Sequence, residues 1–358
     1  MTRAPLRRQT PRAAVDVLIG PSNAAGQASA IAREIERRLP DAVASSFVAT
    51  KPRSGLTFPA DYVLSLAEQS GKLRRHRRRV LQGHTHVIFE TGRRVLADMH
   101  LGSMLDDLAS MREAEIAVAA LLHGSEIRSP KRHRELYQVT PFDDPDDEYT
   151  RQLQAVADAT ATAIAQFPGP VFVTTPDLLD FVPDAVWLPL VVPSPADRPA
   201  PVLEHSRPIV LHAPSNSKLK GSQYIDPVLQ EWDRRGRIRY RRVSGVSHSD
   251  LMALVGKSDI VVDQAMVGSY GTFAIESMAR GRVTLTNIDP RVRERIDDEL
   301  PFEGFTPATL DEALTRILDD REQAADRASQ GPGYCRRWHD GERTIQRLAD
   351  FLQPRPHR

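Results

Sequence analysis

The sequence predicts an α/β protein built from two doubly wound parallel sheets, one in each half of the chain. Short apolar runs typical of buried strands alternate with helical patterns along nearly the whole length, as in βαβ units. A length of 358 residues fits about two domains of ordinary size. A proline-rich stretch near the middle separates two series of such units.

The first series is expected to form one domain over residues 15–192. Residues 15–19 read as a buried strand, residues 20–26 as a turn of small residues, and residues 28–39 as a helix whose apolar side chains recur every three to four positions. Further strands are expected at 43–48, 86–90, 116–123 and 171–174, with helical or loop-like spacers at 104–112 and 149–165. The opening order of strand, turn and helix is that of a Rossmann-like unit.

The second series is expected over residues 208–335, after a proline-rich linker at 193–207 where few regular elements can form. Its strands are expected at 208–212, 238–243, 260–263 and 283–287, and its helices at 221–234, 249–256 and 273–280. An amphipathic segment at 344–352 closes the chain. The two halves therefore share an architecture.

Composition excludes several classes of protein. The 48 basic residues nearly balance the 47 acidic ones, so net charge gives no reason to expect a nucleic-acid partner. The single cysteine, Cys335, excludes a disulfide within the chain and a multi-cysteine metal site. No apolar run reaches the roughly 18 to 20 residues that span a bilayer, so the cytoplasm is the expected location. The acidic residues 143–148 are interpreted as a solvated loop, and no metal site is expected.

The densest candidate site lies in the second half. The loop 265–272 holds Gly268 and Gly271 and leads into a helix, whose free N–H groups suit a phosphate or diphosphate. Glu276 falls near the start of that helix. It is either an acceptor for ribose hydroxyls or only a favourable partner of the helix dipole.

Two other segments end strands at the expected carboxyl edge. Residues 212–221 supply Ser215, Lys218 and Lys220, which suit a diphosphate or, alternatively, form a solvated lysine loop. His123 ends the apolar run 116–122 and is expected to face the cleft, with a structural histidine as the alternative.

Together these segments resemble the GT-B glycosyltransferases, and specifically glycosyltransferase family 4. The resemblance covers roughly residues 15–352 and is strongest over 258–281, where a glycine loop precedes Phe-Ala-Ile-Glu-Ser-Met-Ala-Arg-Gly. The segment His123-Gly124-Ser125-Glu126 is similar to the family's His-Gly-Ser-Asp segment. Residues 336–354 fall in a stretch similar to the terminal helices that cross back to the first domain.

The resemblance implies two domains facing each other across a cleft and a metal-independent, retaining transfer of a sugar. The donor is a nucleotide-diphosphate sugar, and the acceptor is a glycan, a lipid-linked sugar or a small molecule. His123 and Glu276 are the implied catalytic residues. The implied donor-binding residues are Gly26, Ser215, Lys218, Lys220, Asp263, Gln264, Gly268, Ser269, Tyr270, Gly271, Thr272 and Glu276.

The chain departs from the family pattern at two positions. Gly268 stands where the Glu-x7-Glu signature has its first Glu, and Asp263 or Gln264 are the candidates to compensate. Ser215 stands where the family has an arginine, and Lys218 is the candidate for the second positive charge. Gly268 in place of the signature Glu keeps one alternative open, a catalytically silent binding or partner subunit. A sugar-nucleotide epimerase, which can share the two-domain fold, is a second alternative, with Glu126 and Asp263 as its candidate carboxylates.

A basic run at residues 72–79 carries six Lys or Arg residues within eight positions. Such a patch attracts anionic lipid headgroups, and its place in the acceptor half would suit a lipid-linked acceptor at the inner membrane face. A solvated helix face is the alternative, and nucleic acid is not expected.

Overall fold

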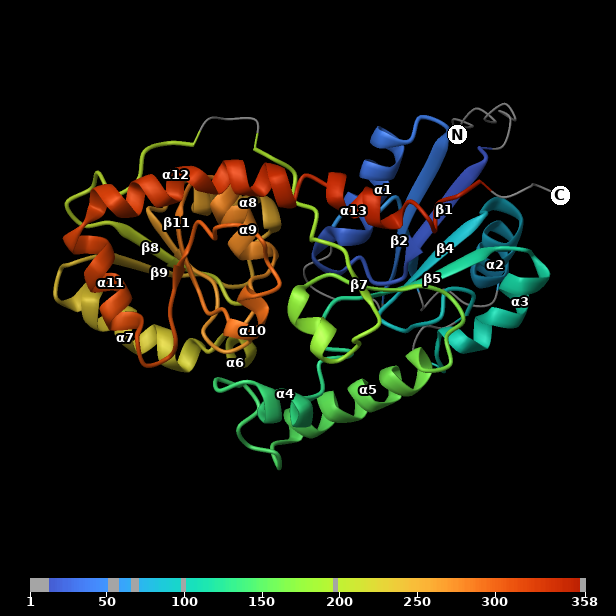
Figure 1. The fold of residues 1–358 in the computed structure, drawn as a ribbon, viewed down its shortest axis with the longest axis horizontal. Coiled ribbons are helices and arrows are strands. Elements are labelled where there is room, and N and C mark those ends of the chain that lie inside the picture. Colours follow the sequence, from blue (N-terminus) through green and yellow to red (C-terminus); the bar gives the residue numbers. More distant parts are fainter. Residues whose placement is uncertain (1–12, 51–57, 66–70, 98–100, 196–198, 355–358) are drawn as a thin grey trace.

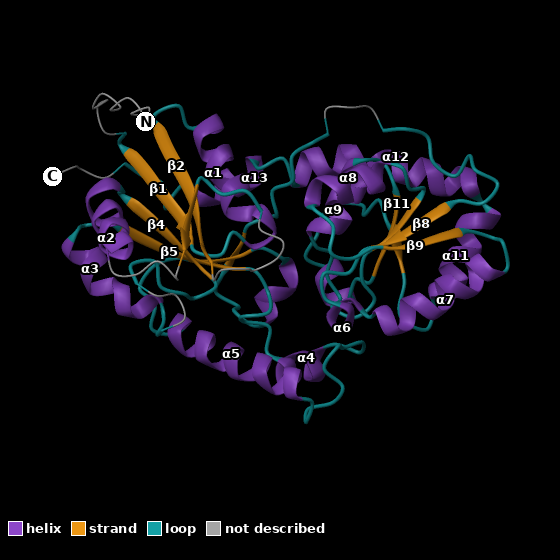
Figure 2. Ribbon diagram, turned by 180° about the vertical axis from the view of Figure 1, so that it is seen from behind, coloured by secondary structure: helices purple, strands orange, loops and turns teal. Residues whose placement is uncertain are grey.

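The computed structural model describes residues 13–50, 58–65, 71–97, 101–195 and 199–354. They form two parallel sheets, each covered by helices, which lie side by side in Figures 1 and 2. One sheet has seven strands in the order β3-β2-β1-β4-β5-β6-β7, and the other has five in the order β12-β11-β10-β8-β9. The predicted α/β fold of two Rossmann-like domains is confirmed.

The sheet of the N-terminal domain forms because its central strands are almost wholly apolar and buried on both faces. Val17 of β1 lies between Ala44 of β2 and His86 of β4 in the parallel register. The strands are β1 (Val15–Gly20), β2 (Ala42–Thr50), β3 (Tyr62–Ser65), β4 (His86–Glu90), β5 (Ala117–Leu122), β6 (Val171–Val173) and β7 (Val186–Trp187). The helices that follow β1, β3, β4 and β5 are α1 (Gln27–Arg38), α2 (Gly71–Gly83), α3 (Leu108–Glu113), α4 (Pro130–Leu136) and α5 (Glu148–Ile164).

The sheet of the C-terminal domain is smaller and follows the same logic. Its strands are β8 (Ile209–His212), β9 (Arg239–Arg242), β10 (Ile260–Val262), β11 (Val283–Thr286) and β12 (Glu303–Gly304). Its helices are α6 (Ser217–Lys220), α7 (Ser222–Arg234), α8 (His248–Gly256), α9 (Thr272–Ala279), α10 (Pro290–Arg293) and α11 (Leu310–Asp319). The short strands β3, β7 and β12 and the helices α4, α6, α10 and α11 were not predicted from the sequence.

The predicted helix over 221–234 is confirmed as α7, which spans Ser222–Arg234. A separate short helix, α6, was not predicted; it begins at Ser217, because the Asn216 side chain accepts a hydrogen bond from the Leu219 amide and caps it. Gly221 then separates α6 from α7 with φ 73°. A side chain at Gly221 would also press on Met266, since a Cβ atom there would lie 2.6 Å from the Met266 Cγ atom. The two lysines of this segment therefore sit on a short helix of their own.

Strand order marks where ligands are expected. In the first sheet, strands β2 and β3 are added on one side of β1 and strands β4 to β7 on the other, so the strand order reverses between β1 and β4. In the second sheet it reverses between β8 and β10. Such switch points, at the carboxyl ends of parallel strands, are where open α/β sheets bind ligands. The loops after β1, β4, β8 and β10 are therefore where a ligand site is expected.

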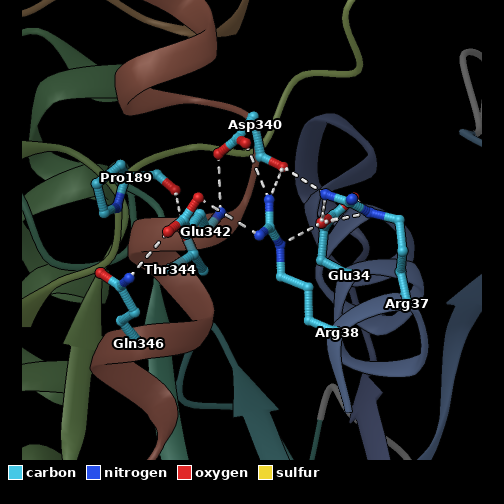
Figure 3. A network of polar contacts seen from close by, with 8 residues as sticks. All are labelled: Glu34, Arg37, Arg38, Pro189, Asp340, Glu342, Thr344 and Gln346. Atoms are coloured by element: carbon cyan, nitrogen blue, oxygen red, sulfur yellow. Dashed lines mark hydrogen bonds and ion pairs between the residues drawn. The ribbon is translucent and has the colours of Figure 1, made fainter. Parts of the chain in front are cut away.

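The C-terminal helices cross back onto the N-terminal domain, as the fold prediction required. Helix α12 (Arg321–Trp338) packs on α9, and α13 (Glu342–Leu348) packs on α1. Figure 3 shows the polar contacts at this crossing, where Arg38 of α1 binds Glu34 and Asp340, each at 2.9 Å. The Thr344 hydroxyl donates to the Pro189 carbonyl at 2.6 Å. Helix α13 is thereby fixed to the N-terminal domain.

A second bridge between the domains is made by α4, α5 and the loop between them, along the lower edge of Figure 1. Asp147 before α5 binds Lys218 at 2.5 Å, and the Tyr149 hydroxyl accepts a hydrogen bond from the Asn216 amide at 2.9 Å. Among the described residues, no helix is both long and apolar enough to cross a membrane.

Candidate active site

Two adjoining cavities lie at the carboxyl ends of the strands. The inter-domain compartment, of about 390 Å³, is lined by both domains, from Ala24 and His123 on one side to Gln264 and Thr272 on the other. The C-terminal compartment, of about 430 Å³, is lined mainly by the C-terminal domain. The two share Ala25, Ser215, Lys220 and Thr272, so they form one continuous cleft. A groove of about 660 Å³ between α1 and α13 shares no residue with this cleft.

His123 reaches the inter-domain compartment from the end of β5. Its Nε2 atom lies 2.8 Å from Oε1 of Glu90, which ends the neighbouring strand β4 and is fully buried. Burial lowers the pKa of His123, but the hydrogen bond and the charge of Glu90 outweigh it, and the net shift is upward. His123 is therefore held in the cavity wall by a carboxylate that the sequence analysis did not single out.

The loop after β1, residues 20–26, forms the floor beside His123. Asn23, Ala25 and Gly26 all have positive φ, at 46°, 49° and 75°. Ala24 and Ala25 line the inter-domain compartment, whereas Gly26 caps α1 and lines neither cavity. A Cβ atom at Gly26 would lie 3.1 Å from the Phe58 ring. Gly26, which was predicted to bind the donor, therefore allows the backbone turn of the loop, and its neighbours Ala24 and Ala25 face the cleft.

The two predicted lysines point to different places. Lys220 lines both compartments, and its Nζ atom lies 2.5 Å from Oδ1 of Asp263. Asp263 is fully buried, and its Oδ2 atom has no hydrogen-bond partner among the described residues. Lys218 instead contacts Asp147 and lines neither compartment. Ser215, which stands near both lysines in the sequence, does line both compartments.

The loop before α9 closes the other side of the inter-domain compartment. Gln264 shapes this loop, because its amide nitrogen donates to the Ser269 and Asn287 carbonyls and its oxygen accepts from two loop amides. The hydroxyl of Ser269 is buried and has no partner in the described structure. The predicted residues of this loop that line the compartment are Gln264, Ser269, Tyr270, Gly271 and Thr272.

Gly268 is not brought to the cleft. Its φ is 74°, and a Cβ atom there would lie 3.0 Å from the Tyr137 ring and 3.2 Å from Asp289. Tyr137 belongs to the N-terminal domain, so the position of the missing signature Glu is a close backbone contact between domains. A glutamate with this backbone would be strained and crowded.

The C-terminal compartment contains one buried carboxylate, Glu276, which is 8% exposed. Its Oε1 atom lies 2.5 Å from Nε2 of His248, and this hydrogen bond raises the pKa of the histidine. The His248 ring packs 5.1 Å from the ring of Phe58, which comes from the N-terminal domain. The other walls are mostly apolar: Pro214, Val243, Val246, Leu251 and Phe273. Such a pocket suits a flat base with a sugar whose hydroxyls reach Glu276.

Sequence reasoning missed four residues of this site. Glu90 and His248 hold the predicted His123 and Glu276. Arg128 lines the inter-domain compartment and pairs with the buried Asp177 at 2.6 Å. Arg128 lies within a segment that the sequence analysis singled out, whereas Glu90, His248 and Asp177 lie tens of residues away from their partners and meet them only in the folded structure.

No group of three or more His, Cys, Asp or Glu side chains that could hold a metal ion occurs in the described residues. In the acidic loop, Asp147 caps α5 and binds Lys218, and Asp144 accepts a hydrogen bond from the Asp146 amide. These contacts are those of a structured surface loop.

Comparison with known proteins identifies the fold. No family model matches the chain, and no curated protein sequence matches it. HepE of Anabaena, solved with UDP and glucose, is similar in structure with a TM-score of 0.62 at 11% identity, over 94% of this chain and 98% of that chain. Sucrose-phosphate synthase of Thermosynechococcus elongatus gives 0.57 at 13% identity, over 94% and 97%. A glycosyltransferase of Rickettsia africae gives 0.55 at 10% identity, over 96% and 98%. The chain thus has the two-domain fold of GT-B glycosyltransferases.

Proposed function

We propose that the protein is a glycosyltransferase that moves a sugar from a nucleotide-diphosphate sugar to an acceptor with retention, as the resemblance to family 4 implies. The observation that best supports this proposal is the continuous cleft, in which an apolar compartment with Glu276 adjoins a polar compartment with His123. Lys220 lies where the two meet. HepE, of the same fold, was solved with UDP-glucose.

The residues that line the two compartments suggest where the nucleoside, the diphosphate and the sugar of the donor bind. The nucleoside occupies the C-terminal compartment, with its ribose hydroxyls at Glu276. The diphosphate lies at the junction, beside Lys220 and the free amides at the start of α9. The sugar occupies the inter-domain compartment, which Ser269 lines with a buried hydroxyl that has no partner in the described structure. Of the two candidates to replace the missing signature Glu, Gln264 lines this compartment, whereas Asp263 lines neither compartment and reaches the cleft only through its ion pair with Lys220.

In the reaction, the bond between the sugar's anomeric carbon and the diphosphate oxygen breaks, and the acceptor oxygen bonds to that carbon. For retention, the acceptor attacks from the face the diphosphate leaves, and its proton passes to the departing phosphate oxygen. Lys220 and the α9 amides stabilise the negative charge on the leaving diphosphate. No step requires a metal ion.

One observation favours a second candidate, a catalytically silent protein that binds nucleotide sugars. Two expected donor contacts are absent from the cleft: Gly268, which stands in place of the signature Glu, packs on Tyr137, and Lys218, the candidate for the second positive charge, is bound by Asp147. No such observation favours an epimerase. Glu126 accepts hydrogen bonds from the His123 and Gly124 amides and does not line the inter-domain compartment.

A binding screen followed by a transfer assay tests this function. Thermal shift against UDP, GDP, dTDP and their sugars should stabilise the protein with one nucleotide family, since a ligand of the native state raises its stability. Glu276→Gln should abolish that shift, whereas Glu312→Gln, an exposed glutamate of α11, should not. Anomeric signals in the NMR spectrum of the product report retention. Binding without transfer to any acceptor would support the silent protein, and no binding would refute both.

We also propose that the acceptor is lipid-linked and that the cytoplasmic enzyme binds the inner membrane face through α2. Leu73, His76 and Val80 face the domain core, while Arg74, Arg75, Arg77, Arg78 and Arg79 are exposed. None of these five arginines pairs with a carboxylate in the described structure. Because α2 belongs to the acceptor domain, this basic face would set the cleft close to lipid.

Vesicle sedimentation tests the membrane proposal. The protein should bind vesicles containing phosphatidylglycerol and not pure phosphatidylcholine, and binding should weaken with salt. Arg74→Glu with Arg78→Glu should abolish this binding. A matched control is Arg239→Glu with Arg241→Glu on β9, two exposed arginines in the other domain. Equal loss in both variants would show only a general charge effect and would overturn the assignment to α2.

A further inference from the structure

Glu90 is a buried carboxylate that accepts hydrogen bonds from two segments beside the inter-domain compartment, the loop after β1 and His123 at the end of β5. It ends β4 and has no exposed surface. Its Oε1 atom accepts from His123 Nε2 at 2.8 Å, and its Oε2 atom accepts from the Ser22 and Asn23 amides at 2.9 and 2.7 Å. One side chain therefore joins two separate segments of the cavity wall.

The loop after β1 needs such support. Asn23 and Ala25 adopt positive φ, a backbone region that non-glycine residues rarely occupy and that persists only where surrounding structure imposes it. Glu90 holds the amide of Asn23, and the Asn23 side chain in turn accepts from the Ser29 amide at 3.1 Å and donates to the Pro59 carbonyl at 3.0 Å. Ala24 and Ala25, which this network fixes, line the compartment.

We propose that Glu90 is a positioning residue for sugar transfer, which fixes His123 and the loop 20–26 against the donor sugar. This inference rests on the proposed function. Glu90 lines neither compartment, so it acts only through the groups it holds. Its loss should lower kcat far more than the affinity for the nucleotide, because Ser22, Asn23 and His123, which it contacts, do not line the C-terminal compartment, and the loop that it fixes contributes only Ala25 to that lining.

The charge on His123 gives this role a second readout. The charged groups around its ring are Glu90 on β4, Glu126 on its own loop, and Arg128 and Lys220, which line the same compartment. Burial favours the neutral imidazole, while Glu90 and Glu126 favour the cation. Replacing Glu90 with a neutral amide should therefore lower the pKa of His123, and any limb of the pH–rate profile that reports the imidazolium should move to lower pH.

Glu90→Gln is the main variant, and Asp107→Asn is its matched control. Asp107 is another buried carboxylate of the same domain, and it accepts from the Val95 and Leu96 amides at 2.7 and 2.9 Å and from Arg94. It lines neither compartment. Both variants lose a comparable buried contact, but only Glu90→Gln should lower kcat, by about 10- to 100-fold as expected for a displaced catalytic group. Asp107→Asn should keep wild-type kcat.

Three measurements on the full-length protein decide the question. Calorimetry with the nucleotide that stabilises the wild type tests the proposed function alone, and Glu90→Gln should match the wild type within twofold. The transfer assay gives kcat and its pH profile, and NMR titration of the His123 ring gives its pKa. Wild-type kcat with an unmoved His123 titration in Glu90→Gln would overturn the inference, as would an equal loss of kcat in Asp107→Asn.

A double-mutant cycle with His123 tests the same role in a second way, and its single variant His123→Gln still tests it if Glu90→Gln folds poorly. If Glu90 acts through His123, then His123→Gln should lower kcat on its own, and adding Glu90→Gln should lower it by much less than the product of the single effects. Fully multiplicative effects would show that the two residues act independently. If the wild type binds no nucleotide, the proposed function fails, whereas the His123 titration still tests whether Glu90 controls that ring.

Discussion

Replacing Lys220 should destabilise the protein for a reason separate from ligand binding. Asp263 is fully buried, its Oδ2 atom has no partner, and its Oδ1 atom depends on Lys220. Lys220→Met would leave a carboxylate buried and unpaired, which costs about 3 kcal/mol, the lower end of the usual range because the lysine is itself 21% exposed. For a domain of roughly 150 to 250 residues this corresponds to a Tm lower by about 6 to 12 °C.

The opposite truncation should cost less. Asp263→Asn removes the buried charge and leaves Lys220, whose ammonium group can reach solvent, so we expect a loss of about 1 kcal/mol. The double variant Lys220→Met with Asp263→Asn should regain most of the stability lost in Lys220→Met. Differential scanning calorimetry of the three variants measures this directly. If Asp263→Asn were the more destabilising single change, or if the double variant showed no recovery, the reasoning from burial would be wrong.

The same variants separate folding from donor binding. Lys220→Met and the double variant should both bind the nucleotide about 10- to 100-fold more weakly, because a charge-assisted hydrogen bond to the diphosphate is lost in each. A stable double variant that does not bind would assign Lys220 to the donor site without ambiguity. A double variant that binds like the wild type would remove Lys220 from that site.

Three further predictions concern His248, Gly268 and Lys218. Because the hydrogen bond to Glu276 raises the pKa of His248, the pair stabilises the fold fully below the unfolded value of about 6.5 and loses this effect as pH rises through the higher folded value. The Tm of His248→Gln should thus fall furthest below the wild type near pH 6 and approach it near pH 9; a constant difference would contradict the pairing. Gly268→Glu should lose about 1 to 2 kcal/mol in a denaturant titration, from its left-handed backbone alone, and gain no transfer activity; an active, stable variant would show that the loop can rearrange. Lys218→Ala should raise the pKa of Asp147 from about 2 towards its ordinary value and leave nucleotide affinity unchanged by calorimetry; a large loss of affinity would return Lys218 to the donor site.

The sequence allowed the fold to be predicted because each central strand is a continuous apolar run followed by a helical period. It could not reveal which side chains meet across strands. Glu90 and His123 are 33 positions apart, and they touch because β4 and β5 are neighbours at the carboxyl edge. Strand order is a property of the folded sheet, so the support of His123 was invisible in a linear reading.

The two lysines show a different limit. Sequence spacing grouped Lys218 with Lys220, but residues two apart on a helix point to nearly opposite sides. The short helix α6, capped by Asn216, sends Lys220 into the cleft and Lys218 towards Asp147. Had residues 217–220 been recognised as helical from the Asn216 cap, the separation of the two charges would have been predictable.

The double crossing of the chain limits how the domains can move. The first crossing follows β7 and the second follows α12, and the two are hydrogen bonded to each other, since the Val192 amide donates to the His339 carbonyl at 2.9 Å and His339 Nδ1 lies 2.8 Å from the Leu190 carbonyl. Two domains joined by a pair of adjacent loop segments that are hydrogen bonded to each other can rotate about a short hinge. We therefore expect rotation about one axis near Leu190 and His339, with little sliding. Helices α4 and α5 lie at the opposite edge of the molecule in Figure 1, so they would move furthest in this rotation. Their contacts with Lys218 and Asn216 would then hold the closed arrangement of the two domains.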